Sequence, residues 1–146
     1  MRLVVDTNIA FSGILNTDGR IARIFLQPKS RFNFYSTQQL LNEIEEHKGK
    51  IKKIAGYTDQ DLNRAIALIT SRTRFINASL IPKEVYLKAE ALTLKIDIDD
   101  TEFVALGEHA KAKLWSGDKA LVKGLRKKWD KFITTEELYN LLTIRK

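Results

Sequence analysis

The chain has no cysteine, two histidines and two prolines among its 146 residues. The lack of cysteine excludes disulfide bonds and thiolate chemistry, and two histidines alone are too few for a typical zinc site. No apolar run reaches the ~20 residues that a membrane-spanning helix needs, and the N-terminus lacks the apolar stretch of a signal peptide. We therefore expect an intracellular, cytoplasmic protein with no membrane partner.

The sequence also has few points at which it would divide into domains. Pro28 and Pro82 are far apart, and no Ser/Gly-rich linker, internal repeat or low-complexity tract occurs. A hydrophobic content of 44% is enough to bury a sizeable core. Residues 1–146 are therefore expected to form a single domain, as is usual for a chain of this length.

Short apolar segments alternate with segments of helical periodicity. The first strand is expected at residues 2–5, followed by a loop through Ser12 and Gly13. Further strands are expected at residues 32–35, 75–76, 114–115 and 132–133, with helices at residues 19–27, 58–71 and 82–94 and others that begin near residues 36–37, 99–100, 118 and 134. This alternation is typical of an α/β fold with a parallel sheet, here of about five strands.

Acidic residues stand where several of these segments end. Asp6 follows the strand of residues 2–5, Asp118 follows an apolar segment, and Asp100 closes a run that also holds Asp97 and Asp99. Ligands of an open parallel sheet bind at the carboxyl ends of its strands. Carboxylates gathered there repel one another unless a divalent cation neutralises them, and Mg²⁺ prefers oxygen ligands. We therefore expect a magnesium or manganese site at this edge of the sheet.

Further polar residues extend this set. Glu43 lies three residues after Leu40 on an expected helix, which places it near the apolar face and pointing inward. Thr7 and Asn8 directly follow Asp6 and are expected to bond water or the scissile phosphate. Ser116 adds a hydroxyl two residues before the aspartate that begins the next helix.

Each carboxylate also has a simpler explanation. Asp6, Asp118 and one member of the 97–100 cluster suit the N-cap of a following helix, and Glu43 suits a solvated helix surface. Three carboxylates within four residues are nevertheless more than a cap needs. The order of these positions along the chain therefore carries the prediction, rather than any single residue.

Four sequence blocks contain the acidic positions and follow one another along the chain. They are Val4-Val5-Asp6-Thr7-Asn8, Leu41-Asn42-Glu43-Ile44, Asp100-Thr101-Glu102-Phe103-Val104-Ala105-Leu106 and Leu114-Trp115-Ser116-Gly117-Asp118. In this order the blocks resemble the PIN-domain ribonuclease family. The last two blocks are the most specific, the glutamate block is the weakest, and residues 50–95 contain no motif of the family.

The resemblance implies a three-layer α/β/α sandwich with a small central parallel sheet. It implies an endoribonuclease that depends on Mg²⁺ or Mn²⁺ and hydrolyses RNA phosphodiester bonds. Many small prokaryotic members of the family are toxins paired with a neutralising antitoxin. An antitoxin protein is therefore a candidate partner, and a homodimer is a candidate assembly.

The resemblance also assigns roles to individual residues. The catalytic, metal-binding residues that it implies are Asp6, Glu43, Asp100 and Asp118. The supporting residues that it implies are Thr7, Asn8 and Ser116. Asp97 and Asp99 flank Asp100, and each is a candidate to assist that residue or to take its place.

The chain is basic, with 25 lysine and arginine residues against 18 aspartate and glutamate residues and a formal charge of +7. A basic surface favours polyanionic partners, nucleic acid above all. Basic residues gather in the segments 48–53 and 119–131. Both segments are candidates for phosphate contacts with RNA, and both also suit an ordinary solvated helix face.

Two other functions fit parts of the sequence. A non-catalytic module that binds RNA or protein would keep the PIN-like fold and the basic surface without cutting. A receiver-type phosphoryl-transfer domain also clusters aspartates at strand ends, but it needs a phospho-accepting aspartate on a middle strand, and the sequence offers no such strand. The order of the acidic residues favours the nuclease.

Overall fold

In the computed structural model, which describes residues 1–117 and 119–144, five strands form one parallel sheet. Their order across the sheet is β3-β2-β1-β4-β5. The strands are β1 (Arg2–Val5), β2 (Asn33–Thr37), β3 (Thr73–Ile76), β4 (Lys113–Trp115) and β5 (Phe132–Ile133). The expected positions of the strands and the small parallel sheet are confirmed, with boundaries that differ by up to two residues.

The central strand, β1, is apolar because helices cover both faces of the sheet. Leu3, Val4 and Val5 are fully buried, and a strand covered on both faces has no polar residues in alternation. The register places Val4 opposite Tyr35 of β2 on one side. On the other side Val5 lies opposite Trp115 of β4.

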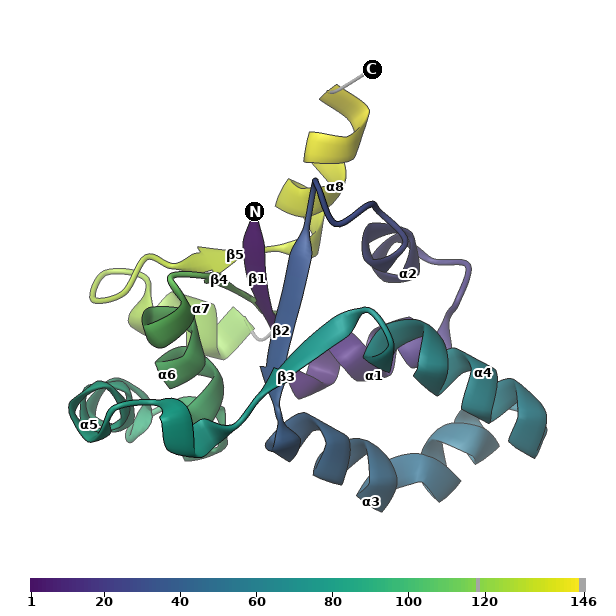
Figure 1. Cartoon of the computed structure of the whole chain (residues 1–146), viewed down its shortest axis with the longest axis horizontal. Coiled ribbons are helices and arrows are strands. Elements are labelled where there is room, and N and C mark those ends of the chain that lie inside the picture. Colours follow the sequence, from purple (N-terminus) through teal and green to yellow (C-terminus); the bar gives the residue numbers. More distant parts are fainter. Residues whose placement is uncertain (118, 145–146) are drawn as a thin grey trace.

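Helices form a layer on each face of the sheet. The helices are α1 (Thr7–Leu15), α2 (Arg20–Phe25), α3 (Gln38–Ala55), α4 (Asp59–Thr70), α5 (Lys83–Thr93), α6 (Thr101–Ala110), α7 (Lys119–Leu125) and α8 (Thr135–Ile144), with short 3₁₀ helices η1 (Ala78–Leu80) and η2 (Ile98–Asp100). Helices α1 to α4 contact one another, and α8 packs on α2, whereas α5 contacts α6 and α7 (Figure 1). The expected three-layer α/β/α architecture is confirmed.

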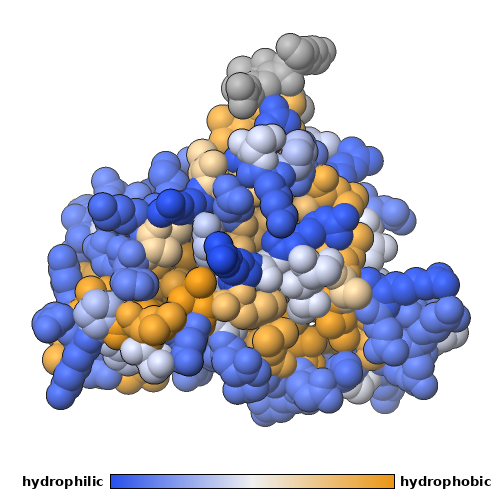
Figure 2. All heavy atoms as spheres, in the orientation of Figure 1, coloured by the Kyte–Doolittle hydropathy of each residue, from blue (hydrophilic) through white to orange (hydrophobic). Residues whose placement is uncertain are grey.

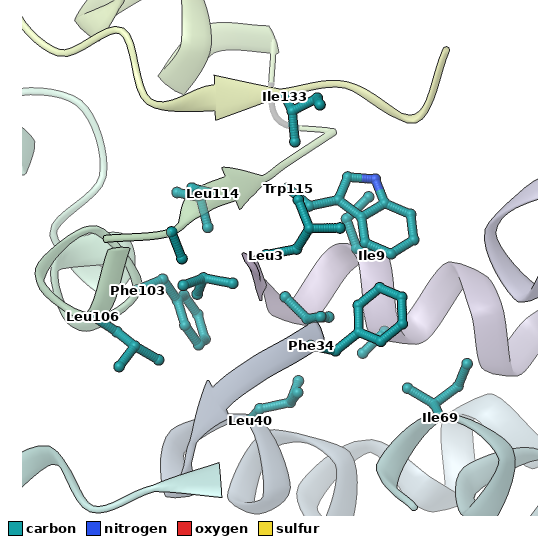
Figure 3. Packing of buried hydrophobic residues seen from close by; sticks show 14 of the residues in the cluster. Leu3, Ile9, Phe34, Leu40, Ile69, Phe103, Leu106, Leu114, Trp115 and Ile133 are labelled. Carbon is teal, nitrogen blue, oxygen red and sulfur yellow. The ribbon is translucent and has the colours of Figure 1, made fainter. Parts of the chain in front are cut away.

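Aromatic and aliphatic side chains fill the space between the layers. Figure 3 shows Phe34 and Trp115 together on one side of the sheet, and Phe103 and Leu106 beside Leu114 on the other. Phe25 of α2 packs against Phe34, with ring centroids 4.5 Å apart, and against Trp115 at 5.2 Å. The core therefore fixes β1, β2 and β4 between α2 and α6, and the candidate site lies at the carboxyl ends of these strands.

The loop expected through Ser12 and Gly13 is wrong, because residues 7–15 form helix α1. Its apolar residues Ile9 and Ile14 are buried. A Cβ at Gly13 would lie 2.9 Å from Cδ1 of Ile69. Gly13 is therefore a contact point that lets α4 approach α1, and not the turn that its residue type suggested.

Helix α4 begins at a capping box formed by Thr58 and Asp61. The Thr58 hydroxyl accepts a hydrogen bond from Asp61 N at 3.1 Å, and the Asp61 carboxylate accepts one from Thr58 N at 3.2 Å. This reciprocal pair satisfies two N–H groups that would otherwise lack partners at the helix start. A threonine followed three residues later by an aspartate predicts such a capping pair at the start of the helix expected at residues 58–71, and the structure confirms it.

Large apolar side chains reach the surface around helix α5. Leu80, Leu87, Leu94 and Ile98 are each more than half exposed, at 65, 53, 61 and 52%. Figure 2 shows apolar side chains gathered in the area that α5 occupies in Figure 1. Within the described residues, none of the helices combines the length and the apolarity that a bilayer crossing requires.

Candidate active site

The structure brings the acidic residues of the first three blocks to one pocket at the carboxyl edge of the sheet. The pocket has a volume of about 140 Å³. We call it the acidic pocket, and it is lined by Asp6, Thr7, Asn8, Gln39, Glu43, Asp97, Asp99, Asp100 and Phe103. It draws on the start of α1, the first turns of α3, η2 and the start of α6. Residues that are almost 100 positions apart in the sequence therefore face one small space.

Asp6 directly follows the carboxyl end of β1 and is only 2% exposed. Its Oδ1 accepts a hydrogen bond from Ile9 N at 2.9 Å, so the residue is the N-cap of α1. The capping role considered from the sequence is therefore real. It does not exclude a second role, because an ionised carboxylate has two oxygens and about four acceptor sites.

Glu43 is half-buried and points inward from α3, as expected from its position after Leu40. The Gln39 side chain donates from Nε2 to Glu43 Oε1 at 2.9 Å and to the Asp99 carbonyl at 2.8 Å. Gln39 thus connects the glutamate of α3 to the acidic segment before α6. This residue was not identified from the sequence, although its place four residues before Glu43 on a helix is the spacing of side-chain pairs.

The aspartates of the 97–100 cluster differ in their surroundings. Asp97 accepts a hydrogen bond from Asp99 N at 3.0 Å and caps η2. Asp99 is exposed, whereas Asp100 is half-buried at the end of η2, directly before α6. Asp99 or Asp100 was expected to cap this helix. Asp100 takes the N-cap position, but its side chain makes no capping bond to the described N–H groups of α6.

Thr7 supplies a buried hydroxyl to the acidic pocket. The residue is 8% exposed, and its Oγ1 has no hydrogen-bond partner among the described residues. A buried hydroxyl without a partner carries a desolvation cost, which a bound water, ion or phosphate oxygen would offset. Asn8 also lines the pocket, but its side chain is exposed.

Ser116 does not line the acidic pocket but lies next to it. If the β1–β4 register is continued by one residue, Asp6 stands opposite Ser116, which is 2% exposed. The register of β1 and β2, continued by two residues, places Thr37 opposite Asp6. Thr37 is fully buried, and its Oγ1 has no partner among the described residues. The sequence offers Ser36 or Thr37 as the cap of the helix that begins there, and Thr37 takes the N-cap position of α3. Asp118 lies outside the described residues.

The residues of the acidic pocket fit a hard cation by their chemistry. Carboxylates, an amide and a hydroxyl are all oxygen donors of the kind that Mg²⁺ and Mn²⁺ bind. Within residues 1–117 and 119–144, no three His, Cys, Asp or Glu side chains are close enough together to hold a metal ion. Mg²⁺ usually takes only one or two carboxylates and completes its shell with water and phosphate. The described carboxylates therefore suit a site that substrate and water help to complete.

The fold and the acidic pocket define an α/β/α protein that presents carboxylates at the carboxyl edge of a parallel sheet. A sequence model of the PIN domain matches residues 4–142. The chain therefore belongs to the PIN domain family, whose members are generally nucleases that use divalent metal ions.

A solved structure supports the fold. The chain is similar to a chain in the crystal structure of VapBC2 from Rickettsia felis bound to a DNA fragment from their promoter, with a TM-score of 0.68. The two chains share 16% identity, and the likeness covers 92% of this chain and 97% of the other. A search among curated proteins gives no match.

Proposed function

We propose that this protein is a metal-dependent endoribonuclease that hydrolyses RNA phosphodiester bonds at the acidic pocket. The observation that carries the proposal is the convergence of Asp6, Glu43 and Asp100 on one space in a member of the PIN domain family. Four of the five carboxylates that line the pocket come from segments far from Asp6 in the sequence, so local capping does not explain their gathering.

In this proposal Asp6, Glu43, Asp100 and Asp118 would hold Mg²⁺ or Mn²⁺. Such an ion lowers the pKa of a bound water and screens the charge that builds up on the phosphate. The buried position of Asp6 keeps its carboxylate fixed, because the cap bond to Ile9 N restrains it. Gln39 restrains Glu43 in the same way.

Polar groups at the start of α1 would position the substrate. The Thr7 hydroxyl and the Asn8 amide line the pocket beside Asp6, and both can donate a hydrogen bond to a phosphate oxygen. Asp97 caps η2 and so holds the segment that delivers Asp100. We assign Asp97 and Asp99 supporting roles, and we assign Ser116 a supporting role at the adjoining strand end.

The substitution Asp6→Asn tests the proposal because it removes the charge and keeps the cap. Asparagine is as good an N-cap as aspartate, so the fold should survive. Cleavage of a labelled single-stranded RNA with Mn²⁺ should fall at least 100-fold, and Glu43→Gln and Asp118→Asn should also reduce it strongly. Glu46→Gln on the exposed side of α3 is the matched control and should cut like the wild type. Cleavage at the wild-type rate by Asp6→Asn would contradict the mechanism.

The alternative is a module that binds RNA or protein without cutting. Cleavage assays with Mn²⁺, with Mg²⁺ and with a chelator separate the two functions. Cleavage that requires the metal supports the nuclease, whereas binding without any metal-dependent cutting supports the module. Family membership favours the nuclease.

The protein partners follow from the family resemblance. We propose an antitoxin as a second protein that neutralises the nuclease, and a homodimer as the assembly. Co-expression with the product of an adjacent gene, followed by copurification and a cleavage assay, tests the first. Light scattering of the purified chain tests the second.

A further inference from the structure

A second, larger pocket adjoins the acidic pocket at the same edge of the sheet. Its volume is about 650 Å³. We call it the basic pocket, and it is lined by Ser116, Gly117, Lys119, Val122, Lys123, Arg126, Lys127, Thr134, Thr135 and Glu136. Four of these side chains are cationic and one is anionic, so the pocket carries an excess of positive charge.

Both pockets have lining residues at the carboxyl ends of β1 and β4. Asp6 lines the acidic pocket and Ser116 lines the basic pocket. The two residues are the next pair after Val5 and Trp115 in the register of β1 and β4. Neighbouring strands lie about 5 Å apart, so one lining residue of each pocket lies beside the other, close enough for a single ligand chain to reach both pockets.

The lysines of the basic pocket are available to an anion. Among the described residues, Lys119, Lys123 and Lys127 make no salt bridge, and all three are exposed. Arg126 has only a long contact of 3.9 Å with Glu137. In the other basic segment, Lys48 pairs with Glu45 at 3.1 Å and Lys52 with Asp59 at 2.7 Å. Lys131, at the end of the segment 119–131, pairs with Glu108. The three lysines that line the basic pocket therefore differ from Lys48, Lys52 and Lys131 in having no salt bridge to the described residues.

The Thr135 hydroxyl completes the wall opposite α7, whereas the neighbouring Thr134 hydroxyl donates to Glu137 Oε1 at 3.1 Å. The Thr135 hydroxyl accepts a hydrogen bond from Trp115 Nε1 at 3.0 Å, which fixes its oxygen and leaves its proton able to point into the pocket. The described lining contains no aromatic side chain on which a base would stack. Charge and hydroxyl groups suit phosphate and ribose, and the lack of stacking groups argues against reading of bases.

We propose that the basic pocket binds the sugar–phosphate backbone of single-stranded RNA next to the scissile phosphate, a proposal that rests on the nuclease function above. The acidic pocket, at about 140 Å³, admits a phosphodiester group but not a base pair. The basic pocket, at about 650 Å³, lies in the size range of sites for whole small molecules, about 300–1,000 Å³. The RNA strand therefore runs from the end of β1 across Ser116 to α7. Its phosphates are held by charge, so the protein has little preference for the RNA sequence.

The test measures the salt dependence of RNA binding in the full chain. The substitutions Lys123→Gln and Lys127→Gln together remove two positive charges from the basic pocket, and Lys50→Gln and Lys53→Gln together remove two exposed charges from α3. Binding of a labelled single-stranded RNA is followed by fluorescence anisotropy in the Asp6→Asn background. For single strands each lost phosphate contact reduces the slope of log K against log salt by about 0.7.

We expect the variant of the basic pocket to lose about 1.4 from that slope and the α3 variant to keep the slope of the parent. Equal losses in the two variants, or none in either, would overturn the proposal. Equal binding of an RNA duplex of the same length would overturn its single-stranded part. Cleavage is measured separately with Asp6 intact, so a chain that binds RNA through Lys123 and Lys127 but cuts nothing supports the basic pocket and refutes the nuclease.

Discussion

Glu108 shows how a single carboxylate ties the end of α6 to the segment before β5. Its Oε2 accepts a hydrogen bond from Lys131 Nζ at 2.5 Å, and its Oε1 accepts one from Trp129 Nε1 at 3.3 Å. The hydrogen bond and the charge of Lys131 lower the pKa of Glu108 from its ordinary value of 4.5, although partial burial opposes them. The ionised form is therefore the one that the fold favours.

This pKa shift predicts a loss of stability in acid. A carboxylate whose pKa is lower in the folded state stabilises the fold fully above its unfolded pKa of 4.5, and the contribution disappears as the pH falls through the lower folded value. Glu108→Gln should reduce the free energy of unfolding at pH 7 by about 1 kcal/mol or less, as for a partly exposed pair. Urea unfolding at several pH values should show this difference vanish below pH 4.5. Glu46→Gln is the control, and an equal pH profile for both variants would contradict the prediction.

The sequence predicts a residue of the candidate site only where the neighbouring residues already indicate its position. Asp6 and Asp100 could be predicted because each stands at the end of a readable segment, and Glu43 because its helix has a clear apolar face. Gln39 and Thr37 could not be predicted as part of the site. The position of Thr37 follows from the pairing of β1 with β2, and that of Gln39 from the packing of α3 beside η2. Both are contacts between distant segments, which no local sequence pattern indicates.

At the scale of elements, α7 positions the acidic segment through one close contact. A Cβ on Gly124 would lie 2.5 Å from Cδ1 and 3.2 Å from Cγ1 of Ile96. Ile96 directly precedes Asp97, which caps η2. A side chain at Gly124 would therefore push on the segment that delivers the aspartates to the acidic pocket.

The substitution Gly124→Ala should consequently reduce RNA cleavage more than its effect on stability suggests. The gain in helix propensity, about 1 kcal/mol, is offset by the displacement of Ile96. Gly49→Ala in α3 is the matched control, because no atom lies within 4 Å of its new Cβ, and it should stabilise the fold by about 0.5–1 kcal/mol. Urea unfolding and cleavage rates of both variants check this.

A second substitution tests the mechanism of that effect. Ile96→Val removes the nearest atom, Cδ1, and should restore cleavage when it is combined with Gly124→Ala. Failure of the double variant to recover would show that Ile96 does not transmit the change. Full activity of Gly124→Ala alone would also contradict the proposed contact.

The elements themselves were predicted well where hydrophobic pattern and capping agree. Helix α4 begins at the predicted Thr58–Asp61 pair, and the apolar strand of residues 2–5 lies at the sheet centre. Helix α1 was missed because Ser12 and Gly13 resemble a turn. Its stability comes from the Asp6 cap and from burial against α3 and α4, and the second of these is a tertiary effect.

At the scale of the whole molecule, a basic chain concentrates carboxylates at one edge of its sheet. The formal charge is +7, yet five carboxylates line a pocket of about 140 Å³. Like charges that line one small pocket destabilise the folded state unless a cation or protons neutralise them. The stability of the fold should therefore depend on divalent metal.

Mn²⁺ at about 100 times its dissociation constant should stabilise the fold by about 2.7 kcal/mol. For a chain of this size that corresponds to a rise in Tm of about 5–10 °C. The rise should disappear with a chelator and should be much smaller in Asp6→Asn, whereas Glu46→Gln should respond like the wild type. Calorimetry without any substrate measures this, and an equal Tm with Mn²⁺ and with chelator would refute the metal site.

The central place of β1 has a consequence for how the protein is made. Strand β1 leaves the ribosome before the two strands that flank it, β2 and β4, and Trp115 of β4 pairs with Val5 more than 100 residues earlier. Contacts between such distant segments form late, because the intervening chain must first be synthesised and ordered. The acidic pocket lacks a wall until Phe103 has emerged, and the basic pocket lacks one until Glu136 has. Under the nuclease function proposed above, a nascent chain therefore cannot bind or cut RNA at these two pockets until the residues up to Glu136 have left the ribosome.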